Sequence, residues 1–181
     1  QLVDYDGSKD YRFSIADEVG NVFITDNKGN PLAGWDPLTF DSPTSGPVKH
    51  YRVGGTDVFC IVLENGELHL MSRRAKSFPG FPLSTNEEIK SNYNLQPGSS
   101  FASTNWVVLS TSGGLFTFNL KGKTIDRKQL YKPNPFTEFK LHNDISEKRF
   151  LISKRTENRL TIADQQDKMI FEKDYLSDQK V

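Results

Sequence analysis

The stretch Gly20-Asn21-Val22-Phe23-Ile24-Thr25-Asp26 decides the fold, because versions of it occur three more times in the chain. The other copies are Gly66-Glu67-Leu68-His69-Leu70-Met71-Ser72, Gly113-Gly114-Leu115-Phe116-Thr117-Phe118-Asn119 and Asn158-Arg159-Leu160-Thr161-Ile162-Ala163-Asp164. Their first apolar residues are Val22, Leu68, Leu115 and Leu160. The copies therefore follow one another at steps of 46, 47 and 45 residues. A nearly constant period of about 20–50 residues is typical of stacked or radial repeat proteins.

Each copy lies within a series of four short, strand-like runs. In the first repeat we expect strands at residues 2–5, 11–16, 22–25 and 31–35. The turns between them, at residues 17–20 and 26–30, are rich in Asp, Asn and Gly, whose side chains or positive φ angles favour tight turns. Alternating apolar residues bounded by such turns predict antiparallel strands and hairpins.

The later repeats follow the same plan. The expected strands are 48–53, 58–63, 68–71 and a run ending near Pro82; then 99–102, 106–110, 115–120 and 124–130; and finally 139–142, 149–153, 160–163 and 169–175. No segment holds a 3.6-residue apolar period for long, although residues 86–94 have room for a turn or two of helix.

These patterns predict an all-β fold. Four-stranded antiparallel units of about 46 residues are typical of β-propeller blades, and a β-sandwich is the main rival because it also uses short, regularly spaced strands. We expect one domain over residues 1–181, with blades at about 1–46, 47–93, 94–136 and 137–181. The true internal repeat favours the propeller.

Ring closure is a separate question. Propellers often close by letting one chain end complete the blade begun by the other, which hides a sheet edge. Here each repeat has its own first and fourth strand, so none is left over for an exchange. We therefore favour half of a larger ring, or an open half that pairs with a second copy, over a closed ring of four blades.

Composition excludes several classes of protein. The 23 basic and 23 acidic residues give a formal net charge of zero, which argues against a nucleic-acid binder. The single cysteine, Cys60, excludes an internal disulfide and lies in an apolar run, so we expect it to be buried. No apolar stretch approaches the roughly 20 residues needed to cross a bilayer. The chain opens on Gln1 rather than Met, and we interpret it as a piece of a longer protein.

Two stretches, residues 4–13 and 20–35, resemble the blades of FG-GAP-like propellers, which combine an Asp-rich turn, a hairpin beginning with Gly and a closing Gly-Trp step. The segment 20–29 is also similar to quinoprotein-type (PQQ-like) repeats. Gly34-Trp35 returns 46 residues later as Gly80-Phe81, and we expect an aromatic side chain here to fill the wedge between neighbouring blades. The chain also resembles large exported repeat proteins of bacteria, which implies a periplasmic or cell-surface location.

One motif has metal-binding character. Asp4, Asp6 and Asp10, with Gly7 between them, resemble the acidic loop that can hold calcium in FG-GAP-like blades. Calcium takes six to eight oxygen ligands, and Leu2 occupies the position of the first acidic ligand, so the charge is low. The other interpretation is a hairpin turn in which the aspartates cap backbone amides, and we favour it because no other repeat has the motif.

Other candidate sites are weak. His50, His69 and His142 are too far apart in sequence to suggest a zinc site, and no nucleophile elbow, phosphate loop or dinucleotide motif occurs. The basic turn at residues 73–76 has the composition to bind an acidic partner, but such turns are usually just solvated. Four aromatic residues are candidates for a sugar- or peptide-binding surface, but we assign them to the core instead: Tyr51, Phe101, Tyr131 and Phe136.

The sequence therefore predicts a non-catalytic β-propeller module that binds a protein partner, with neither nucleic-acid binding nor membrane insertion, and with self-association or further blades as possible completions. The alternative is a calcium-binding or quinoprotein-like accessory domain of an exported enzyme. No cofactor is expected beyond that possible calcium ion.

Overall fold

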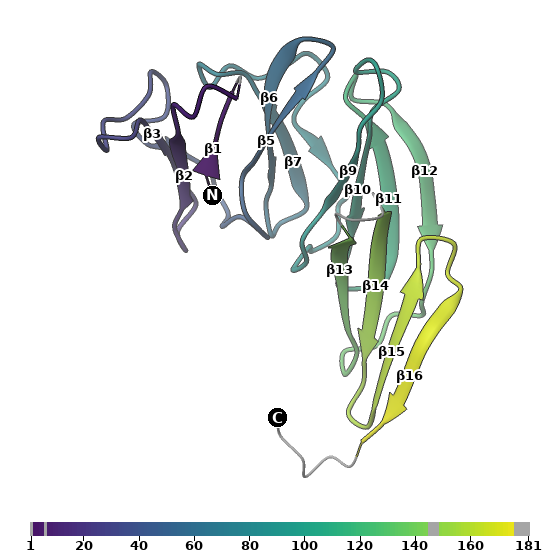
Figure 1. The fold of residues 1–181 in the computed structure, drawn as a ribbon. Helices are drawn as coiled ribbons and strands as arrows, with labels where there is room; N and C mark the ends of the chain where they lie inside the picture. The colour runs from purple at the N-terminus through teal and green to yellow at the C-terminus, as the bar shows by residue number, and fades with distance from the viewer. Residues whose placement is uncertain (1, 6, 145–148, 176–181) are drawn as a thin grey trace.

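The computed structural model describes residues 2–5, 7–144 and 149–175. These residues form sixteen strands in four separate sheets, each of four antiparallel strands in sequence order (Figure 1). Sheet 1 contains β1 (Leu2–Val3), β2 (Arg12–Ala16), β3 (Asn21–Thr25) and β4 (Leu38–Thr39). Sheet 2 contains β5 (Lys49–Val53), β6 (Thr56–Val62), β7 (Glu67–Met71) and β8 (Leu83–Ser84).

The other two sheets have longer fourth strands. Sheet 3 contains β9 (Asn94–Gln96), β10 (Asn105–Leu109), β11 (Gly114–Asn119) and β12 (Thr124–Gln129). Sheet 4 contains β13 (Glu138–Asp144), β14 (Arg149–Arg155), β15 (Arg159–Asp164) and β16 (Met169–Asp174). The prediction of four antiparallel four-stranded units is therefore confirmed.

The four hairpin copies are the third strands β3, β7, β11 and β15. In the first two copies the leading glycine has a positive φ, +92° at Gly20 and +90° at Gly66. A Cβ at Gly20 would lie 2.5 Å from the carbonyl oxygen of Phe40, and one at Gly66 would lie 2.2 Å from that of Glu87. Glycine is required here because the chain leaving the fourth strand crosses directly over the hairpin turn.

Three apolar layers hold the sheets together, one at each junction between neighbouring sheets. Sheets 1 and 2 enclose Val22, Ile24, Trp35, Phe59 and Ile61. Sheets 2 and 3 enclose a larger layer that includes Cys60, Leu68, Leu70, Trp106 and Val108, and sheets 3 and 4 enclose Leu109, Phe139, Leu141, Phe150 and Ile152. The predicted burial of Cys60 is confirmed, and burial raises the pKa of its thiol well above the ordinary value.

The four sheets follow one another along an open arc rather than around a closed ring. In Figure 1 the first sheet lies at one end of the arc and the fourth at the other. The arc exposes one outer face of sheet 1 and one of sheet 4, while both faces of sheets 2 and 3 are covered by neighbouring sheets.

Two fourth strands lie later in the chain than predicted. Residues 31–35 form no strand beyond a single bridge between Pro31 and Thr25, and the two-residue strand β4 begins at Leu38. Proline lacks the amide needed for a longer ladder, and Trp35 turns into the core. In sheet 2 the same displacement places β8 after Pro82.

Sheet 3 also begins differently from the prediction. Its first strand is β9, at residues 94–96, whereas residues 99–102 form a turn. The possible helix at 86–94 is absent. Thr85, Ile89 and Tyr93 are all buried at helix-like spacing, but the Ile89 amide donates to the carbonyl of Glu64 in sheet 2 (2.9 Å) instead of to its own segment. This connection is therefore held by the neighbouring sheet.

Candidate functional site

One face of the molecule carries the turns between the second and third strands of every sheet; we call it the turn face. These turns lie at residues 17–20, 63–66, 110–113 and 156–158. The segments that connect one sheet to the next cross the same face. Surface depressions form where a connection passes beside a turn, and two of them contain charged side chains.

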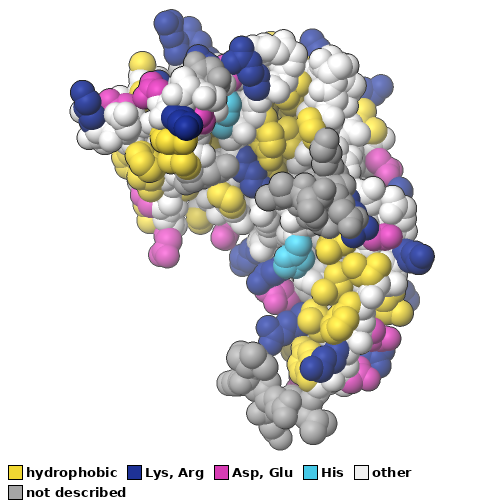
Figure 2. Space-filling model, in the orientation of Figure 1, with side chains coloured by type: hydrophobic (Ala, Val, Ile, Leu, Met, Phe, Trp, Pro, Cys, Tyr) yellow, Lys and Arg dark blue, Asp and Glu magenta, His cyan; other side chains and the backbone are white. Residues whose placement is uncertain are grey.

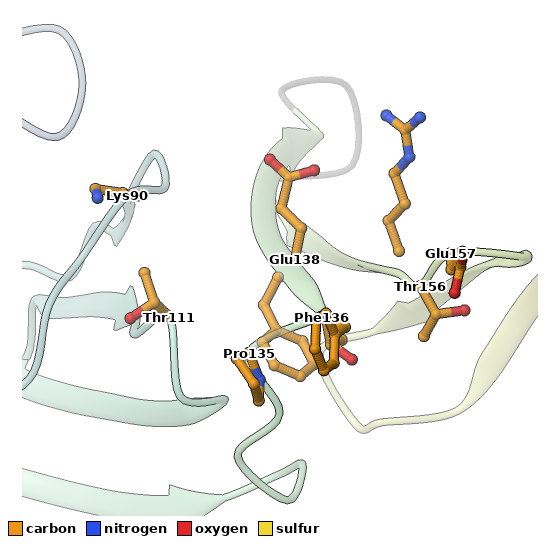
Figure 3. A pocket seen from close by; sticks show the side chains of 10 residues that line it. Lys90, Thr111, Pro135, Phe136, Glu138, Thr156 and Glu157 are labelled. Carbon is orange, nitrogen blue, oxygen red and sulfur yellow. The ribbon is translucent and has the colours of Figure 1, made fainter. Parts of the chain in front are cut away.

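The larger depression, which we call the Phe136 pocket, lies between sheets 3 and 4 and has a volume of about 420 Å³. Figure 3 shows Lys90 and Thr111 on one side, and Phe136, Glu138 and Glu157 on the other. The pocket is thus assembled from two sheet connections and two turns that are far apart in the sequence.

Phe136 is 82 % exposed, the largest exposed fraction among the large hydrophobic residues of the described chain. Its backbone amide donates to the side-chain oxygen of Asn134 (2.9 Å), and the Thr137 amide donates to the Asn134 carbonyl (3.0 Å). These bonds form a tight turn that directs the ring away from the core. The prediction that Phe136 belongs to the core is therefore wrong.

The other aromatic residues assigned to the core behave as expected. Tyr51 and Phe101 pack against the layer between sheets 2 and 3, and Tyr131 packs against the layer between sheets 3 and 4. The Tyr131 ring stacks on Phe139 with centroids 4.8 Å apart. Phe139 also lines the Phe136 pocket, so the stack fixes one part of its wall.

Charges of both signs surround the Phe136 ring. Lys90 forms an ion pair with Glu88 (2.7 Å), and Glu138 forms one with Lys140 (2.7 Å). Arg155 donates through Nε to the hydroxyl of Tyr175 (3.4 Å). The charged side chains among these are exposed, so they can exchange these contacts for contacts with a partner at small cost.

The second depression, of about 400 Å³, lies between sheets 2 and 3 and is lined by Glu64, Glu87 and Glu88. Glu87 is the structured member of this group. It accepts hydrogen bonds from the hydroxyls of Ser110 (2.7 Å) and Ser112 and from Arg127 (2.9 Å). Burial alone would raise the pKa of Glu87, but these bonds and the charge of Arg127 outweigh burial and hold the pKa below its ordinary value.

A polar network joins the first strands of sheets 2, 3 and 4. The Lys49 ammonium donates to the side-chain oxygen of Asn92 (2.7 Å) and to the Tyr93 carbonyl (3.0 Å). Asn143 donates to the same carbonyl (3.0 Å) and accepts from Asn94 (2.9 Å). Burial lowers the pKa of Lys49 to about 8, because the site removes solvent from the ammonium.

The structure places only part of the predicted calcium motif. The carboxylate of Asp4 accepts hydrogen bonds from the amides of Gly7 (2.9 Å) and Lys9 (3.1 Å), and Asp10 forms an ion pair with Arg12 (2.7 Å). Asp6 lies outside the described residues. The arrangement of Asp4 is that of the capped turn, the interpretation we favoured, and calcium binding stays a prediction.

The remaining predicted sites are not brought together. Nowhere in the described chain do three or more His, Cys, Asp or Glu side chains gather in a way that suits a metal ion. His50 bonds to Asp57 (2.9 Å), which also pairs with Arg73 (2.5 Å), so the first residue of the basic 73–76 turn is engaged with its own sheet. Within the same residues, no helix has the length and apolar character to cross a membrane.

Comparisons with known proteins show the fold. No family model and no curated protein sequence matches the chain. Solved structures do match. The structure of BBS1N in complex with ARL6DN has 13 % sequence identity and a TM-score of 0.59, and the match covers 97 % of this chain and 52 % of that one. BamB from Moraxella catarrhalis has 12 % identity and a TM-score of 0.55, and the match covers 96 % of this chain and 47 % of that one. The β-propeller domain of Cps50 (Swd1) from Myceliophteria thermophila also matches (11 %, 0.57, 92 % and 54 %).

At such low identity these likenesses establish architecture alone. The chain spans about half the length of the structures that it matches. Its four sheets are four consecutive blades of a β-propeller.

Proposed function

We propose that this chain is a non-catalytic protein-interaction module and that it binds its partner at the Phe136 pocket. The observation that carries the proposal is the position of Phe136, whose ring is 82 % exposed between charged side chains on the turn face. An aromatic anchor surrounded by polar groups is the arrangement that contributes most binding energy at protein interfaces.

The surroundings of the ring suit a protein segment better than a small molecule. The depression is shallow and open, and Lys90, Arg155, Glu138 and Glu157 offer contacts to a chain that carries both charge signs. Phe139, which lines the pocket, is buried and stacked on Tyr131, so this part of the wall loses little conformational freedom on binding. The solved BBS1N structure, a propeller in complex with ARL6DN, is an example of the fold serving this role.

The test is capture of partners by three immobilised forms of the chain: wild type, Phe136→Ala and Val19→Ala. Val19 is 73 % exposed in the 17–20 turn of sheet 1, so it is an apolar control on the same face but away from the pocket. A protein retained by wild type and Val19→Ala and lost by Phe136→Ala supports the proposal. Equal retention by all three forms contradicts it.

The calcium-binding or quinoprotein-like alternative has less support. The carboxylate of Asp4 already accepts hydrogen bonds from the amides of Gly7 and Lys9. Titration of the chain with calcium in a calorimeter separates the two functions. Binding heat together with a higher melting temperature favours the alternative, and neither effect is expected under our proposal.

A further inference from the structure

The outer face of sheet 1 carries apolar side chains at the same repeat positions that, in sheets 2 and 3, pack against a neighbouring sheet. On β2, Phe13 and Ile15 point away from sheet 2, because Ser14 between them points toward it and donates to the Val48 carbonyl (3.1 Å). Leu2 pairs with Phe13, and Phe23 pairs with Ile15. We call Leu2, Phe13, Ile15 and Phe23 the leading face.

The repeat shows what these positions do in the other sheets. The residues equivalent to Phe13 are Phe59 in sheet 2 and Trp106 in sheet 3. The equivalence follows from strand pairing, because each of the three pairs with the same position of its third strand, which is Thr25, Met71 or Phe118. Phe59 and Trp106 are fully buried against the preceding sheet, and so are Ile61 and Val108, which match Ile15. Phe13 and Ile15 are 43 % and 53 % exposed. The leading face is a blade-packing surface with no blade on it.

The outer face of sheet 4 has the complementary character. Leu160 and Ile162 occupy the motif positions of Val22 and Ile24, which are fully buried against the following sheet. In sheet 4 no sheet follows in the described chain, and both residues are only half-buried. We call this outer face of sheet 4 the trailing face. Its apolar residues are Leu151, Leu160, Ile162 and Phe171.

The two faces lie at opposite ends of the arc in Figure 1, and Figure 2 shows hydrophobic side chains gathered on the surface of both end sheets. The residues of the leading face and those of the trailing face occupy repeat positions that pack against each other at the inner junctions between sheets. Among the described strand residues on the leading face none is charged, whereas the trailing face also carries Lys140, Arg155, Asp164 and Lys173.

We propose that two copies of this chain form a ring in which the trailing face of each copy packs on the leading face of the other. A contact between two different faces closes into a ring when the rotation between copies allows it, and a two-fold rotation supplies both junctions at once. The chain covers about half of several propeller chains, so two copies supply a full set of blades. Eight blades fall within the usual range of about four to eight.

The first test is the mass of the purified chain by light scattering across a dilution series. The proposal predicts a species of twice the 20.5 kDa chain mass that dissociates on dilution. A monomer at every concentration overturns it and assigns the two faces to other blades.

Variants then test which faces meet. Phe13→Asp and Ile162→Asp should each abolish the dimer, while Val19→Asp, in an exposed turn outside both faces, should leave it intact. A mixture of Phe13→Asp with Ile162→Asp should recover part of the dimer. In the mixed dimer the unaltered trailing face of the Phe13→Asp chain meets the unaltered leading face of the Ile162→Asp chain, so one of the two junctions is intact. If Ile162→Asp remains fully dimeric, the faces do not meet as proposed.

A cross-linking experiment covers the case in which an aspartate variant fails to fold. Ile15→Cys and Ile162→Cys, mixed under oxidising conditions, should give a covalent dimer in higher yield than either variant alone. Cys60 does not compete, because it is fully buried. Equal yields from the mixture and from each variant alone contradict the head-to-tail arrangement.

Discussion

The indole N–H of Trp35, at the end of sheet 1, donates a hydrogen bond of 3.0 Å to the carbonyl of Arg73 in sheet 2. Trp35 is fully buried at this junction, so its side chain both fills the wedge between two blades and satisfies a backbone group of the neighbour. The role predicted for the Gly34-Trp35 step is confirmed by this contact. Its equivalent, Phe81, packs against the next apolar layer.

Gly34 should be intolerant of a side chain. Its φ is +89°, and a Cβ there would lie 2.7 Å from the Arg74 carbonyl oxygen. Gly29 has nearly the same φ, +87°, but open space around it. We expect Gly34→Ala to lower the free energy of unfolding by about 2–4 kcal/mol and Gly29→Ala by only about 1 kcal/mol. Chemical denaturation of both variants measures the difference, and equal losses would show that the close approach to sheet 2 is unimportant.

Phe59 and Phe13 should differ in the same measurement, although the repeat makes them equivalent. Phe59→Ala opens a cavity between sheets 1 and 2 and is expected to cost about 3–5 kcal/mol. Phe13→Ala removes a ring that is 43 % exposed and should cost less than about 1 kcal/mol in the dilute monomer. A large loss for Phe13→Ala at low concentration would mean that its face is already covered within one chain.

Acid should weaken the link between sheets 2 and 3 through Glu87. Because folding lowers the pKa of Glu87, its stabilising contribution is complete above the unfolded pKa and is lost as the pH falls through the folded one. Glu87→Gln should therefore cost about 1–2 kcal/mol at pH 7 and progressively less in acid. Unfolding titrations of both proteins from pH 7 downward give the comparison; a constant difference at all pH values is the contrary outcome.

Lys49 should also make the chain more stable as the pH rises, but in the alkaline range. Its pKa falls to about 8 in the folded chain, so between about pH 8 and its ordinary pKa the unfolded chain binds more protons than the folded one. The wild-type chain should gain stability relative to Lys49→Met as the pH rises from 8 to 10. Melting temperatures of the two proteins across this interval provide the measurement, and no change in their difference would contradict the burial of the ammonium.

The hairpin repeat allowed the third strands and the all-β architecture to be predicted, because its Gly and apolar positions are local features. The short fourth strands and the start of sheet 3 were misplaced, since Trp35 and Ile89 are positioned by contacts with neighbouring sheets rather than by their own segments. Phe136 was missed as a surface residue for a similar reason. The only local signal was Asn134 with a proline on each side, which favours a tight turn over a strand.

The most direct test of the proposed function is a photocross-link from the Phe136 pocket. The chain is prepared with benzoylphenylalanine at position 136 or, as a control on the same face, at position 19, and each form is irradiated with a partner captured by wild type. We predict a covalent adduct from position 136 and none from position 19. An adduct from position 19 alone, or equal adducts from both positions, would contradict binding at the Phe136 pocket.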